Sequence, residues 1–425
     1  MTQPDIFVFT QEATSRLTYV LDLFFGNRFA VISDVDVYQS ATGIKINYSD
    51  QQLTGHQIIP HSLLFESKLR EINVGVGSDW FNCATLILDD QPFDVFASAF
   101  YLVSRYEEYL PFEPDDHNRF PAEASCLVKL GLIRKPLVNQ WRKALYNELG
   151  LSHDFKFEYL STIDIDQAWK YHNKGFLRNL GGLWRDWRNG DKDLVSQRID
   201  VLIKGKPDPF YNFNYQDKLH NQFGTTVKYF VQVGKRGEYD KNTDSGNQSF
   251  QSLIHRLARH QQYSIGLHPS YQSNSDFHIL LQEHQTITAI EPSAGVISRQ
   301  HFLKHRFPVT YQRLTQLGIR EEYTLGYTSH SGFRAGIADR FYFFDLEKNE
   351  QTDLLLVPFC YMDITPLHYD ELSLEQAIDD IKRFMDEVRS VNGLFCSLWH
   401  NESLSDDGRW QGWRPLYEEM VAYGE

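Results

Sequence analysis

The pattern of apolar and polar positions changes near residue 150. Before this point, short apolar runs and two longer periodic segments predict strands at 30–34, 43–48 and 84–88 and helices at 95–110 and 137–149. After it, strand-like and helix-like segments alternate, which is typical of a largely parallel sheet covered by helices. We therefore expect a smaller α/β domain over residues 1–150, followed by a larger α/β domain over residues 151–425.

The second part carries the more regular pattern. Its expected strands lie at 156–164, 226–233, 263–268, 294–298, 341–346, 353–359 and 394–399, with helices at 247–261 and 373–392. The last helix has the clearest signals, because Ser373 and Gln376 form a capping box before an apolar stripe and Gly393 ends it. About seven strands in this length favour a barrel over an open sheet.

A long aromatic segment, residues 176–217, directly follows the first of these strands. A connection of this length is more often functional than idle. Its aromatic side chains either stack on a carbohydrate or pack the segment against the body of the protein: Trp184, Trp187, Phe210, Tyr211, Phe213 and Tyr215.

Charge and cysteine usage narrow the class of protein. The net charge of −14 argues against a nucleic-acid or anionic-membrane partner, although a local basic patch remains compatible with it. The four cysteines lie far apart and predict free thiols in a reducing compartment. The N-terminal residues have no signal-peptide pattern, and no apolar run reaches membrane-spanning length. These features predict a cytoplasmic protein without a membrane span.

The first candidate chemistry is a carboxylate pair at the end of a predicted strand. Strand alternation places Asp164 and Asp166 on one face, with Ile163 and Ile165 opposite. One carboxylate can bind a metal while the other serves as a general base towards the metal's water. The alternative is a polar turn in which both aspartates cap the next helix.

Two histidines and an arginine complete the set of candidates. His268, before Pro269, and His400 each end a predicted strand, where α/β folds gather reactive groups. Each is either a functional group or a satisfied structural histidine. Arg334 lies in a glycine-flanked segment and either holds a carboxylate or forms an ordinary ion pair.

In this order, the segments TIDID, GLHPS, GFRAG and SLWHN resemble the polysaccharide deacetylase (NodB-homology) family over residues 156–425. The whole chain is similar to two-domain bacterial proteins, typical of Bacteroidetes, in which a domain of unknown function precedes this module. The resemblance implies a distorted (β/α)7 barrel of the polysaccharide deacetylase type and a divalent metal, often zinc.

The resemblance also implies roles for single residues. Asp164 matches the catalytic base, Asp166 a metal ligand, Arg334 the arginine that orients the base, and His400 the general acid. His268 matches the second histidine of the H-x-x-x-H-P metal motif. The first histidine of that motif is replaced by Ser264, so we expect a third ligand from elsewhere, with His301 the first candidate and His172 the second.

The leading hypothesis is a metal-dependent hydrolase that removes N-acetyl groups from an amino-sugar glycan or its precursor, with carbohydrate as its substrate. A second hypothesis is a catalytically degenerate deacetylase fold that binds carbohydrate or scaffolds a pathway. A third is a hydrolase of another C–N bond, because a fold alone does not fix a substrate. The sequence leaves open the metal, the glycan, the role of the N-terminal domain and the oligomeric state.

Overall fold

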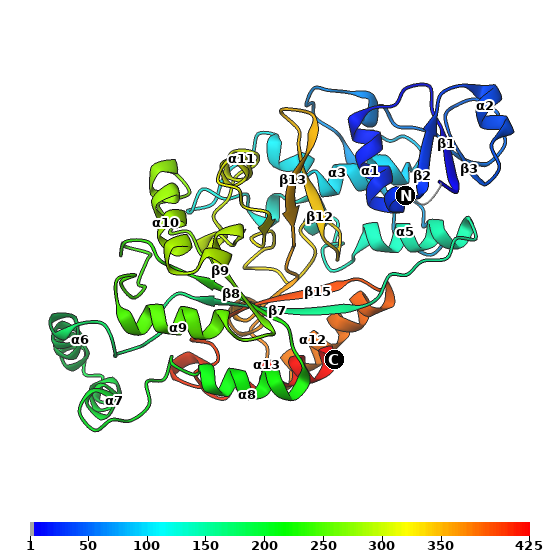
Figure 1. Cartoon of the computed structure of the whole chain (residues 1–425). Coiled ribbons are helices and arrows are strands. Elements are labelled where there is room, and N and C mark those ends of the chain that lie inside the picture. The colour runs from blue at the N-terminus through cyan, green and yellow to red at the C-terminus, as the bar shows by residue number, and fades with distance from the viewer. Residues whose placement is uncertain (1–3) are drawn as a thin grey trace.

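The protein, described here by a computed structural model covering residues 4–425, is built around a nine-stranded sheet (Figure 1). All strands of this sheet run parallel except β12, which pairs antiparallel with β13 at one edge. In spatial order the strands are β12 (Phe341–Asp345), β13 (Glu350–Leu356), β11 (Glu321–Glu322), β10 (Ile297–Ser298), β9 (Tyr263–Leu267), β8 (Val227–Val231), β7 (Glu158–Ile165), β15 (Leu394–His400) and β14 (Tyr361–Met362).

Two smaller sheets lie earlier in the chain. One has four parallel strands in the order β2 (Phe29–Ile32), β1 (Ile6–Phe9), β3 (Ile44–Tyr48) and β4 (His56–Ile58). The other is the antiparallel pair β5 (Val74–Val76) and β6 (Leu86–Leu88). The expected strands at 30–34, 43–48 and 84–88 therefore correspond to β2, β3 and β6.

Helices cover the sheets, and in Figure 1 α8, α9, α12 and α13 lie along one side of β7, β8 and β15. The helices of the first part are α1 (Ser15–Phe25), α2 (Val35–Ser40), α3 (Val95–Val103), α4 (Cys126–Lys129) and α5 (Leu137–Glu148). Those of the second part are α6 (Phe176–Arg188), α7 (Lys192–Leu202), α8 (Phe213–Phe223), α9 (Gln248–Ala258), α10 (Phe277–Ile290), α11 (Val309–Gln316), α12 (Leu374–Ser390) and α13 (Arg414–Gly424). No helix within 4–425 combines the length and the apolar character that a bilayer crossing requires.

Local sequence explains the clearest elements. α12 begins at the predicted capping box. The backbone N–H of Ser373 donates to the side chain of Gln376, and the backbone N–H of Gln376 donates to the side chain of Ser373. In β7, Ile163 and Ile165 point into the hydrophobic core, so the alternating position between them, Asp164, faces the other side of the sheet. The predicted helix over 95–110 is shorter, because Arg105 adopts a left-handed backbone conformation after α3.

The α/β class is confirmed, but the strands of the large sheet do not close into the predicted barrel within residues 4–425. Across residues 4–425 no pairing joins β12 to β14, so the hydrogen-bonded sheet has two edges. The sheet is nevertheless strongly twisted, since β12 and β13 run across the direction of β7 and β15 in Figure 1. A distorted (β/α)7 barrel stays a prediction.

The long segment 176–217 is mostly helical. It contains α6 and α7 and the start of α8. Helix α6 forms although Gly181 and Gly182, residues that disfavour a helix, lie within it. Of its aromatic residues, Phe213 is buried and Tyr211 stacks on Trp169. Part of the segment therefore packs against the body of the protein, whereas α6 and α7 project away from it (Figure 1).

The two parts of the chain share one hydrophobic core. Tyr19 of α1 packs on Phe344 of β12, with ring centroids 5.1 Å apart. Buried ion pairs join the parts as well, because Glu108 accepts hydrogen bonds from both Arg105 and Arg334. That residues 1–150 and 151–425 are independent domains stays a prediction.

Candidate metal centre

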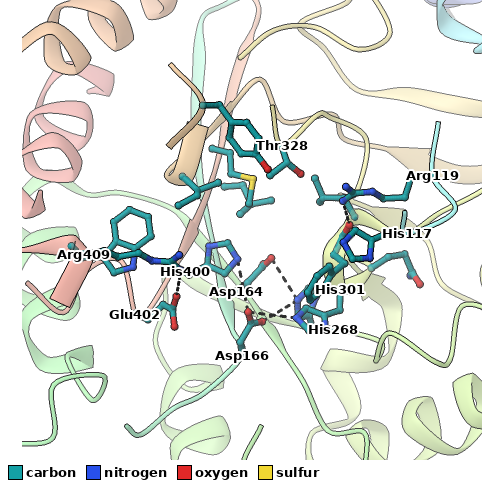
Figure 2. A pocket seen from close by; sticks show the side chains of 18 residues that line it. His117, Arg119, Asp164, Asp166, His268, His301, Thr328, His400, Glu402 and Arg409 are labelled. Carbon is teal, nitrogen blue, oxygen red and sulfur yellow. Dashed lines mark hydrogen bonds and ion pairs between the residues drawn. The ribbon is translucent and has the colours of Figure 1, made fainter. Parts of the chain in front are cut away.

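The candidate residues meet at the carboxyl edge of the large sheet. Parallel pairing puts His400 of β15 opposite Asp164 of β7, and Asp166 follows one residue beyond β7. His268 directly follows β9, and His301 lies in the short helical turn after β10. Figure 2 shows these five side chains pointing towards one another. The residues predicted at the strand ends therefore lie close together, and their roles stay a prediction.

Three side chains offer a set of ligand atoms. Nε2 of His268 lies 3.2 Å from Oδ1 of Asp166, and Nε2 of His301 lies 3.6 Å from Oδ2 of the same carboxylate. All three ligand atoms lie within 4.8 Å of one another. One carboxylate and two imidazoles are a donor set that suits zinc and related divalent metals.

Each histidine is held by a second partner through its other ring nitrogen. Nδ1 of His268 donates to the backbone carbonyl of Arg299 at 2.6 Å. Nδ1 of His301 donates to Asp240 at 2.9 Å. Both arrangements direct the Nε2 edge of the ring at the centre, where this nitrogen offers a lone pair once it has lost its proton. Metal-binding histidines are oriented by this kind of contact.

A second observation, the presence of buried ligand atoms without hydrogen-bond partners in the described part of the chain, also supports a metal ion at this place. Oδ1 of Asp166 and Nε2 of His268 are buried and have no hydrogen-bond partner within 4–425, although they face each other. Buried polar atoms without a partner are costly and call for an explanation. Ligand atoms about 2.0–2.2 Å from a tetrahedral ion are about 3.3–3.6 Å apart, close to the spacings observed.

The centre is also electrostatically arranged for a cation. Burial raises the pKa of Asp166, but His301 and His268 outweigh that effect and hold it well below its usual range. Burial lowers the pKa of His301, but Asp166 and Asp240 raise it to about 9. The pocket thus keeps Asp166 ionised, and its carboxylates attract positive charge.

Asp164 lies beside the centre with a different set of contacts. Its Oδ1 accepts a hydrogen bond from Nη1 of Arg299 at 3.0 Å, and its Oδ2 lies 3.7 Å from Nε2 of His268. The arginine that contacts the predicted base is therefore Arg299. Arg334 instead forms a bidentate pair with Glu108, at 2.7 and 2.9 Å, and does not line the pocket. This corrects the predicted role of Arg334 in favour of the ordinary ion pair.

His400 is oriented by a residue that the sequence did not suggest. Its Nδ1 lies 3.0 Å from Oδ2 of the fully buried Asp363, which also accepts the backbone N–H of His400. Its Nε2 faces the centre, 3.9 Å from Oδ2 of Asp166. Burial lowers the pKa of His400, but Asp363 and Asp166 raise it to about 10. A protonated imidazole is thereby held in the pocket.

The apparent gap at Ser264 has a geometric explanation. Position 264 lies near the amino end of β9, four residues before His268, and its side chain is exposed. Four residues of an extended strand span about 13 Å, so this position is far from the carboxyl edge where the site lies. A histidine there would not reach the centre, whereas His301 does. His172, the other candidate for the third ligand, lies elsewhere and contacts Asp208 at 3.7 Å.

A pocket of about 310 Å³ opens over the centre, near the lower end of the range typical of small-ligand sites. Its walls include the aromatic side chains of Phe302, Tyr369 and Trp410. His117 and Arg119, from the first part of the chain, line the side opposite Arg409 (Figure 2). The pocket is therefore built by residues from both parts.

Three positioning residues escaped the sequence interpretation: Arg299, Asp240 and Asp363. Arg299 and Asp363 each come directly after a two-residue strand, β10 and β14. The predicted strand at 294–298 ends directly before Arg299, so the strand-end rule could have found this residue, whereas β14 was not predicted. Asp240 lies in the loop after β8 and carries no such signal. Phe302, beside His301, has a left-handed backbone conformation (φ 59°) of the kind that often marks functional sites.

Comparison with known proteins adds little about activity. Residues 6–153 match a family model described as "Family of unknown function (DUF7033)", over the region predicted as an N-terminal domain of unknown function. No curated protein matches the sequence. One similar solved structure is a "putative polysaccharide deacetylase" from Mycobacterium smegmatis, at 14% identity and a TM-score of 0.40, over 64% of this chain and 87% of that one. A likeness this distant assigns neither fold nor activity.

Proposed function

We propose that the protein is a metal-dependent hydrolase that removes N-acetyl groups from an amino-sugar glycan or its precursor. The observation that carries the proposal is the clustering of ligand atoms from Asp166, His268 and His301 beside Asp164 and His400. Two of these buried atoms, Oδ1 of Asp166 and Nε2 of His268, have no hydrogen-bond partner within residues 4–425. Ligands, a carboxylate base and a histidine acid are the parts that metal-assisted amide hydrolysis requires.

The side chains have separable tasks in such a reaction. A divalent metal, of which zinc is our first choice, would polarise the amide carbonyl and acidify a water molecule when bound by the three ligands. Asp164, fixed by Arg299, accepts the proton of the attacking water. His400, fixed by Asp363, donates its Nε2 proton to the departing amine. Each of these proton transfers contributes roughly 10²- to 10⁴-fold in rate.

Support for an acetylated sugar comes from the motif order and from the pocket. The aromatic rings of Phe302, Tyr369 and Trp410 suit the apolar faces of sugar rings. Met362 and Leu398 provide an apolar wall near His400 that suits a methyl group. The predicted cytoplasmic location favours a small amino sugar or a precursor glycan over finished cell wall.

The alternative of a degenerate, purely carbohydrate-binding fold rested on Ser264. Position 264 lies at the amino end of β9, far from the site, and His301 offers a third ligand atom in the set. We therefore do not advance that alternative. Hydrolysis of another C–N bond would use the same groups. The substrates in the test must therefore distinguish deacetylation of an amino sugar from hydrolysis of other amides.

The test begins with metal content. Protein loaded with zinc, cobalt or nickel should retain about one ion per chain by elemental analysis, and Asp166→Ala and His301→Ala should each lose it. His172→Ala is the matched control and should retain the ion, because His172 lies outside the centre. Failure of the wild-type protein to retain metal would overturn the centre itself.

The second arm tests the substrate class. Loaded protein is incubated with N-acetylated oligosaccharides and with nucleotide- and lipid-linked amino-sugar precursors, and released acetate is measured. We expect acetate from at least one of them, abolished in Asp164→Asn and in His400→Gln. A protein that holds metal but releases no acetate, and instead hydrolyses other amides, would overturn the substrate and keep the centre.

A further inference from the structure

Helix α6 has its apolar side turned outwards. It projects with α7 beyond the sheet, at the left of Figure 1. Five large apolar side chains on it are between 51% and 82% exposed: Phe176, Leu177, Leu180, Trp184 and Trp187. At about 100° per residue they fall on one face of the helix. An exposed face of this size is unusual unless something covers it.

The opposite face of α6 is polar and packs against α7. Asp186 of α6 is buried and forms an ion pair with Arg198 of α7 at 2.7 Å. Asn179 accepts a further hydrogen bond from Arg198, and Gly182 leaves the space that the guanidinium occupies. The helix is therefore fixed with its polar side inwards, so its apolar side is presented permanently to the surroundings.

The hairpin and its surroundings carry positive charge, unlike the rest of the chain. Residues 174–206 contain eight basic and four acidic side chains, a net of +4, whereas the whole chain has a net charge of −14. Four cations lie around a hollow at the start of α6, and none of them forms an ion pair within residues 4–425: Lys174, Arg178, Lys235 and Arg236.

These cations repel one another. Burial and the charge of Arg178 lower the pKa of Lys174 to about 7, and burial and the charge of Arg236 lower the pKa of Arg178. A negatively charged surface placed against them would relieve this repulsion. A second copy of the protein, docked through the same face, would instead bring two such sets of cations together.

We propose that the α6–α7 hairpin docks on the surface of an anionic lipid bilayer. The Trp, Leu and Phe side chains of α6 enter the boundary between headgroups and acyl chains, and the neighbouring cations contact lipid phosphates. A helix with aromatic and leucine residues on one face and arginines beside them is the form that interfacial membrane helices take. The helix lies in the plane of the surface and does not cross it.

The docking surface is connected to the pocket of the metal centre. Gln197 of α7 donates a hydrogen bond to Asp407 and accepts one from Lys170, which also pairs with Asp407. Asp407 precedes Arg409 and Trp410, which line the pocket. Helix α7 therefore contacts the segment that supplies one wall of the pocket. The docking itself does not depend on the proposed activity.

The test is co-sedimentation of the full-length protein with phosphatidylglycerol vesicles, compared with phosphatidylcholine vesicles. We expect binding to the anionic vesicles and much weaker binding to the neutral ones. Combined replacement of Leu177, Trp184 and Trp187 by serine should weaken binding roughly tenfold or more. Combined replacement of Arg188, Lys235 and Arg236 by alanine should weaken it on the order of 100-fold, since each cation contributes about fivefold.

A matched control replaces three exposed apolar residues of the first part, Val37, Ile59 and Phe81, by serine. This variant should bind vesicles as the wild-type protein does, and all variants should keep the wild-type circular dichroism spectrum. Absence of wild-type binding, or equal loss in the control, would overturn the proposal. So would a solution dimer, measured by light scattering, that the α6 variant converts to monomer, because a second copy would then cover the face.

Discussion

At the scale of single residues, His400 depends on the carboxylate behind it. Asp363 accepts hydrogen bonds from both the backbone N–H and the ring of His400, so it fixes where the ring lies and which nitrogen faces the pocket. Asp164 depends in the same way on Arg299. The two groups proposed to move protons are thus each positioned by a buried partner of opposite charge, which keeps acid and base in separate environments.

Replacing Asp363 by asparagine tests this arrangement. The variant keeps the shape of the site but loses the negative charge that raises the pKa of His400. We expect kcat for acetate release to fall by roughly 10²- to 10⁴-fold. Because the general acid must be protonated, the alkaline limb of the pH–rate profile should move to lower pH.

Measuring the metal content of Asp363→Asn distinguishes a role in positioning His400 from a role in maintaining the structure of the site. Asp363→Asn should bind metal as the wild-type protein does, because Asp363 does not contact the three ligands. Asp353→Asn, at a highly exposed position, is the control and should leave kcat unchanged. An unaltered pH profile in Asp363→Asn would contradict the assigned role.

The residues that the sequence indicated were those at the ends of long strands. Asp164, Asp166, His268 and His400 all follow or end recognisable apolar runs, and parallel strands gather their carboxyl ends at one edge. Arg334 was misassigned, because a glycine-flanked arginine has no local signal for its partner. That partner, Glu108, lies over 200 residues earlier in the chain, and only the fold brings the two together.

At the scale of elements, a helix or strand could be predicted from the sequence when it was long enough and carried its own start and end signals. α12 was predictable because its cap, apolar stripe and end lie within one stretch of sequence. The strands β10, β11 and β14 have two residues each, too few to show a period. They exist because neighbouring strands already offer unpaired backbone groups. His301 was named as a candidate from the sequence, but the two positioning residues Arg299 and Asp363, which directly follow β10 and β14, were not, so the sequence alone did not assemble the complete site.

Three elements of the second part meet at a single buried histidine. His220 of α8 lies 2.8 Å from the hydroxyl of Tyr263, which begins β9, and 2.7 Å from that of Tyr417 in α13. Burial, together with the charge of His260, lowers the pKa of His220 to about 3. The histidine is therefore neutral in the folded protein at all but strongly acidic pH.

This burial has a consequence for acid stability. Below about pH 6.5 the unfolded chain binds a proton at His220 that the folded protein does not bind, so the free energy of unfolding decreases as pH falls. We expect His220→Gln to remove about 1.4 kcal/mol per pH unit from that slope between pH 4.5 and 5.5, and about half as much near pH 6.5. Urea denaturation at several pH values measures it. The control His172→Gln should keep the wild-type slope, and equal slopes in all three proteins would refute the expectation.

At the scale of the whole molecule, a buried ion network joins the two parts of the chain. Glu108 pairs with Arg105 in the first part and with Arg334 in the second, and all three side chains are buried. Burial raises the pKa of Glu108, but Arg334 and Arg105 outweigh it and lower the value to about 2. The network therefore stabilises the fold above about pH 4.5, and this contribution is lost as pH falls towards 2.

Removing the charge of Glu108 should therefore affect the molecule as a unit. Glu108→Gln leaves the buried guanidinium of Arg334 without a carboxylate partner and that of Arg105 with Glu107 alone. We expect it to lower the free energy of unfolding by about 3–5 kcal/mol at pH 7. Circular dichroism and tryptophan fluorescence should still report one coincident transition, because the core is continuous. Glu113→Gln, at an exposed position, should change stability by less than about 0.5 kcal/mol. Two separate transitions would show that the parts unfold independently.

Because residues of the first part of the chain line the pocket, they would contribute to substrate recognition. His117 and Arg119 stand at the rim opposite Arg409, while the groups proposed to react all come from the second part. Consider a chimera in which residues 1–150 are exchanged with those of a homologue. It would keep the reactive groups of one parent and take one side of its pocket rim from the other. Selectivity could then diverge between relatives whose reactive residues are identical.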